Sequence, residues 1–258
     1  DDLRQSYDEP DADFSELLDM LKNCKLPFDY RRLFLSFLKK ALTEIADGRF
    51  YEEYYSSPTV RKFTFAVNLP KPVFDKGEIT LGKNQVRLTF STADTNTGYV
   101  FMSAFIKQKG KSMPAPLKNC LTLDSVRRLP EKSVSSGSVL VKMLSPLCIR
   151  EHTKQENADK YYSVAGDDFK QAAKGIITAQ LVNAGFTEKM AEEFSITPVD
   201  AQKTVVYHYN SYIECSLGMF IIEADSTIIN YLLKNGIGSR KSAGFGLAEL
   251  IAEGGEVI

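Results

Sequence analysis

The order of predicted secondary structure constrains this fold most, because the same order occurs twice along the chain. In each half, runs of β-forming residues and stretches of helical spacing alternate as strand, helix, strand, strand, helix, strand. This is the order of the split βαβ, or ferredoxin-like, motif. The sequence therefore predicts an α+β protein with two ferredoxin-like domains in tandem.

The predicted elements follow one another with few gaps. In the first half, residues 14–26 fit a helix or a strand, a helix spans 30–46, strands span 63–67, 78–81 and 86–90, a helix or strand-to-helix passage spans 97–107, and a strand spans 121–128. In the second half, strands span 138–143, 203–209, 212–223 and 244–251, and helices span 169–184 and 226–234. Asp29 is placed to cap the helix at 30–46, and Gly48 to end it.

Charge and composition predict the domain limits. Residues 1–15 carry a net charge of −5 against −1 for the whole chain, so the other 243 residues are mildly basic at +4. With little apolar content, residues 1–15 are predicted to be a mobile acidic tail. The Ser- and Lys-rich stretch between Pro130 and Gly137 predicts the joint between an N-terminal domain at 16–134 and a C-terminal domain at 135–258.

Composition excludes several classes of protein. Hydrophobic residues make up 43% and charged residues 25%, which is typical of a globular chain rather than a disordered or fibrous one. There is no apolar run of membrane-spanning length, and the sequence opens acidic rather than with a secretory signal. Four scattered cysteines and two histidines are too few for a zinc site of usual spacing. We expect a cytoplasmic protein with four buried thiols, no metal, no cofactor and no membrane contact.

A glycine-rich stretch between the last helix and the last strand stands out. Its four glycines let the backbone approach a ligand closely, and two adjacent cations could meet phosphate. The candidate ligand-binding residues are Gly236, Gly238, Ser239, Arg240, Lys241, Ser242, Gly244, Phe245 and Gly246. The order helix, loop, strand does not fit a dinucleotide fingerprint, and the stretch ending at Gly110-Lys111-Ser112 has Phe105 where a P-loop needs glycine. The alternative is a glycine-rich turn that serves only tight packing.

These residues resemble a known family. The loop Gly236–Gly246 before a C-terminal strand is similar to the signature of the RAMP proteins, and most closely to that of the stand-alone CRISPR endoribonucleases that cut repeat RNA. Further matches spread over about residues 16–253: Leu26-Pro27, Tyr30-Arg31-Arg32 with its helix, the strand at 62–67, Leu144-Ser145-Pro146 and the strand at 215–222.

The resemblance implies two ferredoxin-like domains that bind CRISPR repeat RNA. Arg31 and Arg32 are RNA-binding candidates together with the residues of the glycine-rich loop. It also implies metal-independent cleavage, in which the ribose 2′-hydroxyl attacks the adjacent phosphate and leaves a cyclic phosphate and a 5′-hydroxyl. Such chemistry needs a base, an acid and cations.

The sequence departs from the family at the catalytic base. Many members carry a histidine before the strand at 63–67, where this chain has Tyr54-Tyr55-Ser56-Ser57-Pro58. By position, the catalytic candidates are Tyr55, Lys39, Arg61, Lys62 and Ser56. Tyrosine, with an ordinary pKa of about 10, would need cationic neighbours to act as a base, but could act as an acid or a positioning group.

The two histidines present are alternatives. His208 lies within a predicted strand, where a half-buried structural role is favoured over catalysis. His152 follows a strand, in a loop position that suits either a surface residue or contact with the scissile phosphate.

Two other functions remain open. One is a non-catalytic RAMP subunit that holds guide RNA beside other subunits of a CRISPR effector complex. The other is an unrelated ferredoxin-like enzyme whose loop binds a small phosphorylated ligand.

Overall fold

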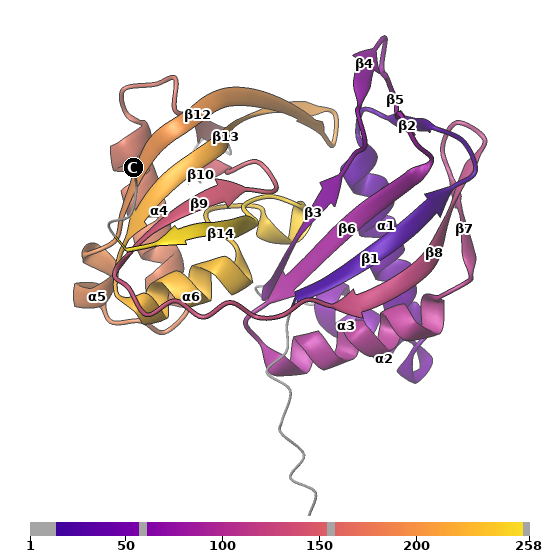
Figure 1. The fold of residues 1–258 in the computed structure, drawn as a ribbon, viewed down its shortest axis with the longest axis horizontal. Coiled ribbons are helices and arrows are strands. Elements are labelled where there is room, and N and C mark those ends of the chain that lie inside the picture. The colour runs from indigo at the N-terminus through magenta and orange to yellow at the C-terminus, as the bar shows by residue number, and fades with distance from the viewer. Residues whose placement is uncertain (1–13, 57–60, 154–157, 255–258) are drawn as a thin grey trace, which may run out of the picture.

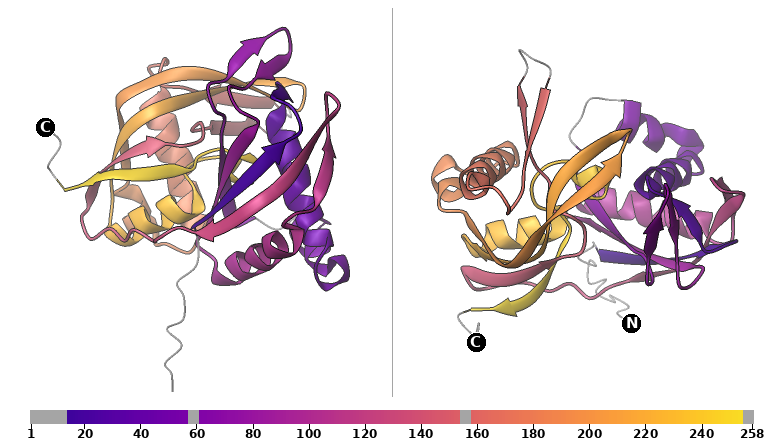
Figure 2. Two further views of the ribbon diagram at one scale, coloured as in Figure 1. Left: turned by 45° about the vertical axis from the view of Figure 1, so that its right-hand side comes forward. Right: turned by 90° about the horizontal axis from the view of Figure 1, so that it is seen from above.

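The computed structural model describes residues 14–56, 61–153 and 158–254. Two antiparallel sheets lie side by side, and each carries helices on one face (Figure 1). A two-stranded hairpin of β10 (Ile149–Thr153) and β11 (Ala158–Tyr162) belongs to neither sheet. Seen from above, this hairpin stands out from the face that carries the helices (Figure 2, right).

The first sheet has the strand order β3-β6-β1-β8-β7. Its elements are β1 (Phe14–Leu21), α1 (Tyr30–Thr43), β3 (Phe63–Asn68), β6 (Gln85–Thr92), α3 (Thr95–Gln108), β7 (Ser112–Ala115) and β8 (Asn119–Arg128). Short helical turns η1 (Ala46–Gly48), α2 (Arg49–Tyr51) and η2 (Glu52–Ser56) follow α1, and a small sheet joins β2 (Lys25–Pro27), β5 (Glu78–Thr80) and β4 (Val73–Asp75).

The second sheet has the order β12-β13-β9-β14. Its domain contains β9 (Ser138–Met143), α4 (Phe169–Asn183), α5 (Glu188–Glu192), β12 (Ser195–His208), β13 (Ser211–Glu223), α6 (Ser226–Asn235), η3 (Lys241–Ala243) and β14 (Ala248–Glu253). When the edge strand β7 is left out and the strands are numbered within each domain, both sheets have the order 2-3-1-4. This repetition confirms the predicted α+β architecture of two ferredoxin-like domains.

Each domain has its own hydrophobic core between sheet and helices. Phe34 of α1 and Phe101 of α3 pack into the first core, and Phe220 of β13 and Ile177 of α4 into the second. Asp19 of β1 is also fully buried in the first domain, and burial raises the pKa of its carboxyl to about 8. Burial thus favours the protonated form of the Asp19 carboxyl.

Several predicted boundaries change. The ambiguous stretch at 14–26 forms strands β1 and β2, so Phe14 and Ser15 belong to the sheet rather than to the predicted tail, whose residues 1–13 lie outside the described part. The predicted last strand at 244–251 begins only at Ala248, because Gly244 and Gly246 have positive φ and leave the ladder. The helix predicted to reach residue 46 ends at Thr43, ahead of Gly48.

The burial of the cysteines also differs from the prediction. Cys148 and Cys215 are buried, whereas Cys24 and Cys120 are only half-buried. In the described part of the chain, no helix has the length and apolar character needed to cross a membrane.

Candidate functional site

The glycine-rich loop lies in the seam between the two domains. A Cβ at Gly236 would lie 2.9 Å from Cβ of Thr64, and one at Gly244 would lie 2.8 Å from the ring of Phe65. Both neighbours belong to β3 of the first domain, and Thr64 Oγ1 donates to the carbonyl of Phe245 at 2.9 Å. These glycines are therefore required by close packing between the domains.

Most backbone N–H groups of the loop also donate hydrogen bonds to acceptors within the protein. The N–H of Ile237 donates to Gly246 O, that of Gly238 to Gln180 Oε1 and that of Ser239 to Cys148 O. The backbone N–H groups of residues 237–244 fall into two sets within the described structure. Those of Arg240, Lys241 and Ser242, at the tip of the loop, are the ones without a protein acceptor. Packing thus accounts for the glycines, and the tip is the part of the loop that is free to meet a ligand.

Arg31 holds the loop from the first domain. Only 7% of this residue is exposed; its Nε donates to Gly244 O at 3.3 Å, and its guanidinium stacks on Phe245 at 5.0 Å. Arg32 is exposed instead, lies over the Tyr209 ring at 4.9 Å and approaches Asp29 at 3.8 Å. Of this predicted RNA-binding pair, only Arg32 has the exposure to contact a ligand directly.

Asp29 does not cap α1 as predicted, since its side chain makes no capping hydrogen bond there. Its carboxylate instead lies 3.0 Å from His208 Nδ1 and accepts the N–H of Tyr209 at 2.9 Å. His208 is fully buried, and this burial lowers the pKa of its imidazole despite the opposing charge of Asp29. The contact links the two domains, which gives His208 a structural position.

Tyr55, Lys39 and Arg61 form a group that we call the N-terminal cluster. Both cations lie over the Tyr55 ring, with Lys39 Nζ 4.9 Å and the Arg61 guanidinium 4.8 Å from its centre. The Tyr55 hydroxyl is buried without a hydrogen-bond partner in the described structure, and burial raises its pKa even though Arg61 opposes the shift. This environment is unsuited to a general base.

The remaining catalytic candidates lie apart from this cluster. Ser56 is exposed at the end of η2. Lys62 is also exposed, and its Nζ lies 3.2 Å from Asp94 Oδ2 at the start of α3. The structure therefore brings Tyr55, Lys39 and Arg61 together and leaves Lys62 paired elsewhere.

Lys241 is the more enclosed of the two loop cations. The Asn235 amide, oriented to satisfy its partners, donates to Lys62 O at 3.0 Å and accepts from Lys241 Nζ at 3.1 Å. Desolvation by burial lowers the pKa of Lys241 to about 8. The Lys241 ammonium therefore loses its proton only slightly above neutral pH.

Arg240 reaches the β10–β11 hairpin. Its Nη2 donates to Asp159 Oδ2 at 3.1 Å and to the Tyr161 hydroxyl at 2.7 Å. Asp159 also accepts from Arg150 and lies 2.8 Å from His152 Nδ1. We call these five residues the hairpin cluster. Sequence analysis missed Asp159 and Arg150; the signal available was the alternation of polar residues in 149–153 and 158–162.

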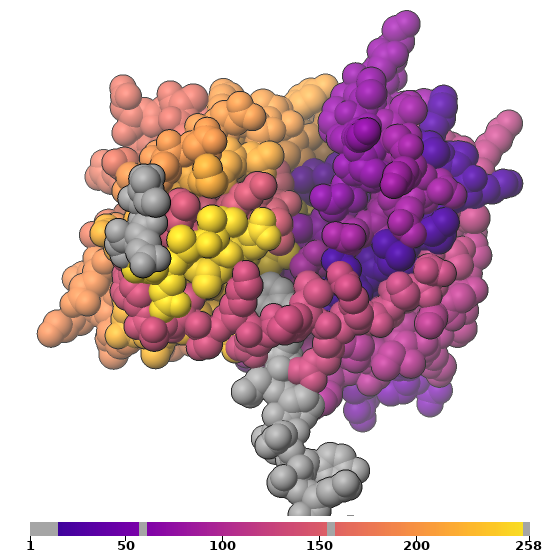
Figure 3. Space-filling model, in the orientation of Figure 1, coloured from indigo at the N-terminus to yellow at the C-terminus, as the bar shows by residue number. Residues whose placement is uncertain are grey.

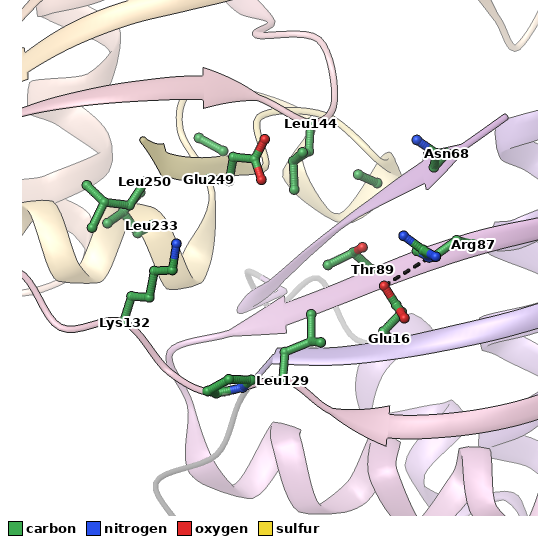
Figure 4. A pocket seen from close by; sticks show the side chains of 13 residues that line it. Glu16, Asn68, Arg87, Thr89, Leu129, Lys132, Leu144, Leu233, Glu249 and Leu250 are labelled. Carbon is green, nitrogen blue, oxygen red and sulfur yellow. Dashed lines mark ion pairs between the residues drawn. The ribbon is translucent and has the colours of Figure 1, made fainter. Parts of the chain in front are cut away.

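A separate cavity of about 290 Å³ opens on the sheet side of the seam. Glu16 and Arg87 line one side and form an ion pair at 2.9 Å, while Lys132 and Glu249 line the other (Figure 4). The space-filling view shows the two domains meeting along this seam (Figure 3). None of the sequence-predicted site residues lines this cavity. Among the described residues, no group of three or more His, Cys, Asp or Glu side chains is arranged to hold a metal ion.

Comparison with known proteins identifies relatives of this fold. Residues 129–250 match the family described as CRISPR associated protein Cas6, C-terminal. A search of curated protein sequences found no match. Among solved structures, the chain resembles an RAMP protein binding different RNA substrates, with a TM-score of 0.77, 21% identity and coverage of 93% of this chain and 99% of the other.

Two further structures extend the comparison. A Cas6-related protein from Pyrococcus furiosus matches with a TM-score of 0.78 and 18% identity, over 93% of this chain and 98% of the other. A Cas6 product complex matches with a TM-score of 0.65 and 14% identity, over 92% and 99%. At these identities the structural likeness shows a shared fold, and the family match adds the C-terminal sequence signature. Residues 129–250 therefore carry the Cas6 C-terminal signature, and the chain as a whole shares the fold of Cas6 and RAMP structures.

Proposed function

We propose that this protein cuts CRISPR repeat RNA into guide RNAs without a metal ion, through attack of a ribose 2′-hydroxyl on the adjacent phosphate. The observation that carries the proposal is the loop tip at Arg240–Ser242, which has N–H groups free of protein acceptors and lies beside a group of cations. Backbone N–H groups and cations together suit a phosphodiester. The Cas6 C-terminal match over residues 129–250 supports repeat RNA as the substrate.

The cations are supplied from both domains. Lys39 and Arg61 of the N-terminal cluster lie on the first domain, and Arg150 and Arg240 of the hairpin cluster on the second. In the proposed reaction these cations contact phosphates of the bound RNA, and those beside the cut stabilise the charge of the phosphorane. Tyr55 contributes the ring that contacts both Lys39 and Arg61.

An aromatic groove supports an RNA substrate. It has a volume of about 480 Å³ and is lined by Phe28, Phe74, Tyr207 and Tyr212, among others. Phe74 is 60% exposed and Tyr212 is 73% exposed, although both are large hydrophobic side chains. Exposed rings beside a groove are suited to stacking on unpaired bases.

The proposal is tested by incubating the protein with end-labelled repeat RNA in EDTA. We expect cleavage that leaves a 2′,3′-cyclic phosphate and persists in the chelator. A matched RNA with a 2′-deoxyribose immediately 5′ of the cut should bind with similar affinity and remain intact, because the nucleophile belongs to the substrate. Cleavage of the deoxy substrate at the normal rate would contradict this mechanism. Binding of both RNAs without any cleavage would favour the non-catalytic effector subunit.

A further inference from the structure

The hairpin cluster is built by strand pairing. In the β10–β11 ladder, Arg150 lies opposite Tyr161 and His152 lies opposite Asp159. Residues directly opposite each other in an antiparallel pair project from the same face, so all four side chains share one face of the hairpin. Arg240 reaches this face from the glycine-rich loop, and Ser239 N donates to Cys148 O at 2.8 Å, just before β10. The cluster is therefore continuous with the loop tip.

Asp159 is the centre of the cluster. Its carboxylate accepts from Arg150 Nη1 at 3.1 Å, from the Tyr161 hydroxyl at 3.0 Å and from Arg240 Nη2 at 3.1 Å, and it lies 2.8 Å from His152 Nδ1. Desolvation opposes ionisation, but the hydrogen bonds from His152, Arg150 and Tyr161 prevail and lower the pKa of Asp159 to about 2. Asp159 is therefore an ionised acceptor at neutral pH.

The contact with Asp159 fixes the tautomer of the neutral His152 ring. An ionised carboxylate can only accept, so His152 donates its Nδ1–H to Asp159, and in the neutral ring Nε2 carries the lone pair. The His152 side chain is 41% exposed, and no described residue hydrogen-bonds Nε2. Nε2 is thus an oriented and accessible base on a ring that shares Asp159 with the guanidinium groups of Arg150 and Arg240.

We propose that His152 is the general base of RNA cleavage, with Asp159 as its positioning residue and Arg150 and Arg240 as the groups that bind the scissile phosphate. This inference rests on the proposed function. His152 Nε2 takes the proton of the 2′-hydroxyl as O2′ bonds to phosphorus and the P–O5′ bond breaks. The departing O5′ takes a proton from water, and the resulting hydroxide is neutralised by the proton that His152 then releases. The products are a 2′,3′-cyclic phosphate and a 5′-hydroxyl.

The first test compares His152→Asn with Lys160→Ala under single-turnover conditions. Lys160 lies on the opposite face of the same hairpin and is exposed, so its variant controls for damage to the hairpin. Loss of a general base typically slows a reaction about 10²–10⁴-fold. For His152→Asn we expect a loss of this size, removal of the rising limb of the pH–rate profile, and little change in RNA affinity. For Lys160→Ala we expect little change in the cleavage rate.

Two further measurements separate a chemical role from a structural one. His152→Gly should regain activity when imidazole is added, which a merely misfolded variant would not do. An RNA with sulfur in place of the bridging 5′ oxygen has a leaving group that needs no acid. This RNA rescues the loss of an acid but not the loss of a base, so His152→Asn should cut it more slowly than the parent protein does.

Two outcomes would overturn the assignment while leaving the proposed function intact. In the first, the parent protein cuts RNA and His152→Asn cuts it at the same rate. In the second, His152→Asn cuts the 5′-thio RNA at the parent's rate, which would place His152 at the leaving group. A parent protein that cuts no repeat RNA would instead overturn the proposed function itself.

Discussion

The N-terminal cluster and the hairpin cluster both combine cations with tyrosine, but they place the ionisable groups in opposite surroundings. At Tyr55 the hydroxyl is buried without a polar partner, and the cations touch only the faces of the ring. At His152 the ring is half-exposed and hydrogen-bonded to an ionised carboxylate. Nearby cations are therefore not enough to make an ionisable side chain an acid–base catalyst. The side chain must also be accessible to solvent and hold its proton in a fixed orientation.

The largest effect after loss of His152 itself is expected from Asp159→Asn. The amide cannot carry the charge that fixes the Nδ1–H tautomer, so the single-turnover rate should fall about 10²-fold. The ¹⁵N chemical shifts of His152 should report a mixture of tautomers in this variant.

Asp159→Glu is the matched control, because it keeps the charge and should recover part of the rate. An unchanged rate and unchanged ¹⁵N shifts in Asp159→Asn would show that the hairpin cluster is only structural.

Arg240→Ala should weaken RNA binding through loss of one phosphate contact. The slope of log affinity against log salt should become shallower by about 0.7, the value for one charge on a single strand. The salt slope of Lys39→Ala tests in the same way whether the N-terminal cluster contacts RNA. If only Lys39→Ala changes the slope, the RNA contacts the N-terminal cluster and not the hairpin.

Lys241 predicts a smaller, pH-dependent effect. Because burial lowers its pKa to about 8, Lys241 is a cation below pH 8 and neutral above it. RNA affinity should therefore fall as the pH rises through 8, and the salt slope should become shallower by up to about 0.7.

Lys241→Arg stays charged over this range and should remove the pH dependence. Affinity that falls equally in Lys241→Arg would assign the titration to another group.

The smallest effect on rate is expected for Tyr55→Phe. The hydroxyl is buried and unpaired, so its removal should leave the single-turnover rate unchanged and raise the free energy of unfolding by about 1 kcal/mol. Tyr55→Ala removes the ring that contacts Lys39 and Arg61 and serves as the disruptive comparison. A large loss of rate in Tyr55→Phe, with RNA binding intact, would move proton transfer to the N-terminal cluster.

Local pattern determined which elements form and in what order. The helical spacing around Leu38 and the alternation around Phe65 were sufficient to place α1 and β3, because periodic burial is written into neighbouring residues. The same order repeated in each half predicted the tandem domains, and the glycine-rich loop together with matches over residues 16–253 indicated the resemblance to the RAMP proteins.

Only the tertiary structure decided which side chains meet. Arg240 and Asp159 are 81 residues apart, and Asp29 contacts His208 across 179 residues. Periodicity carries no information about such pairs, since Arg240 meets Asp159 where the loop packs on the hairpin, and Asp29 meets His208 where the two domains pack together. The sequence also did not show burial: it placed Tyr55 beside cations, but packing against the first hydrophobic core removed the Tyr55 hydroxyl from water, whereas His152 is exposed on the hairpin.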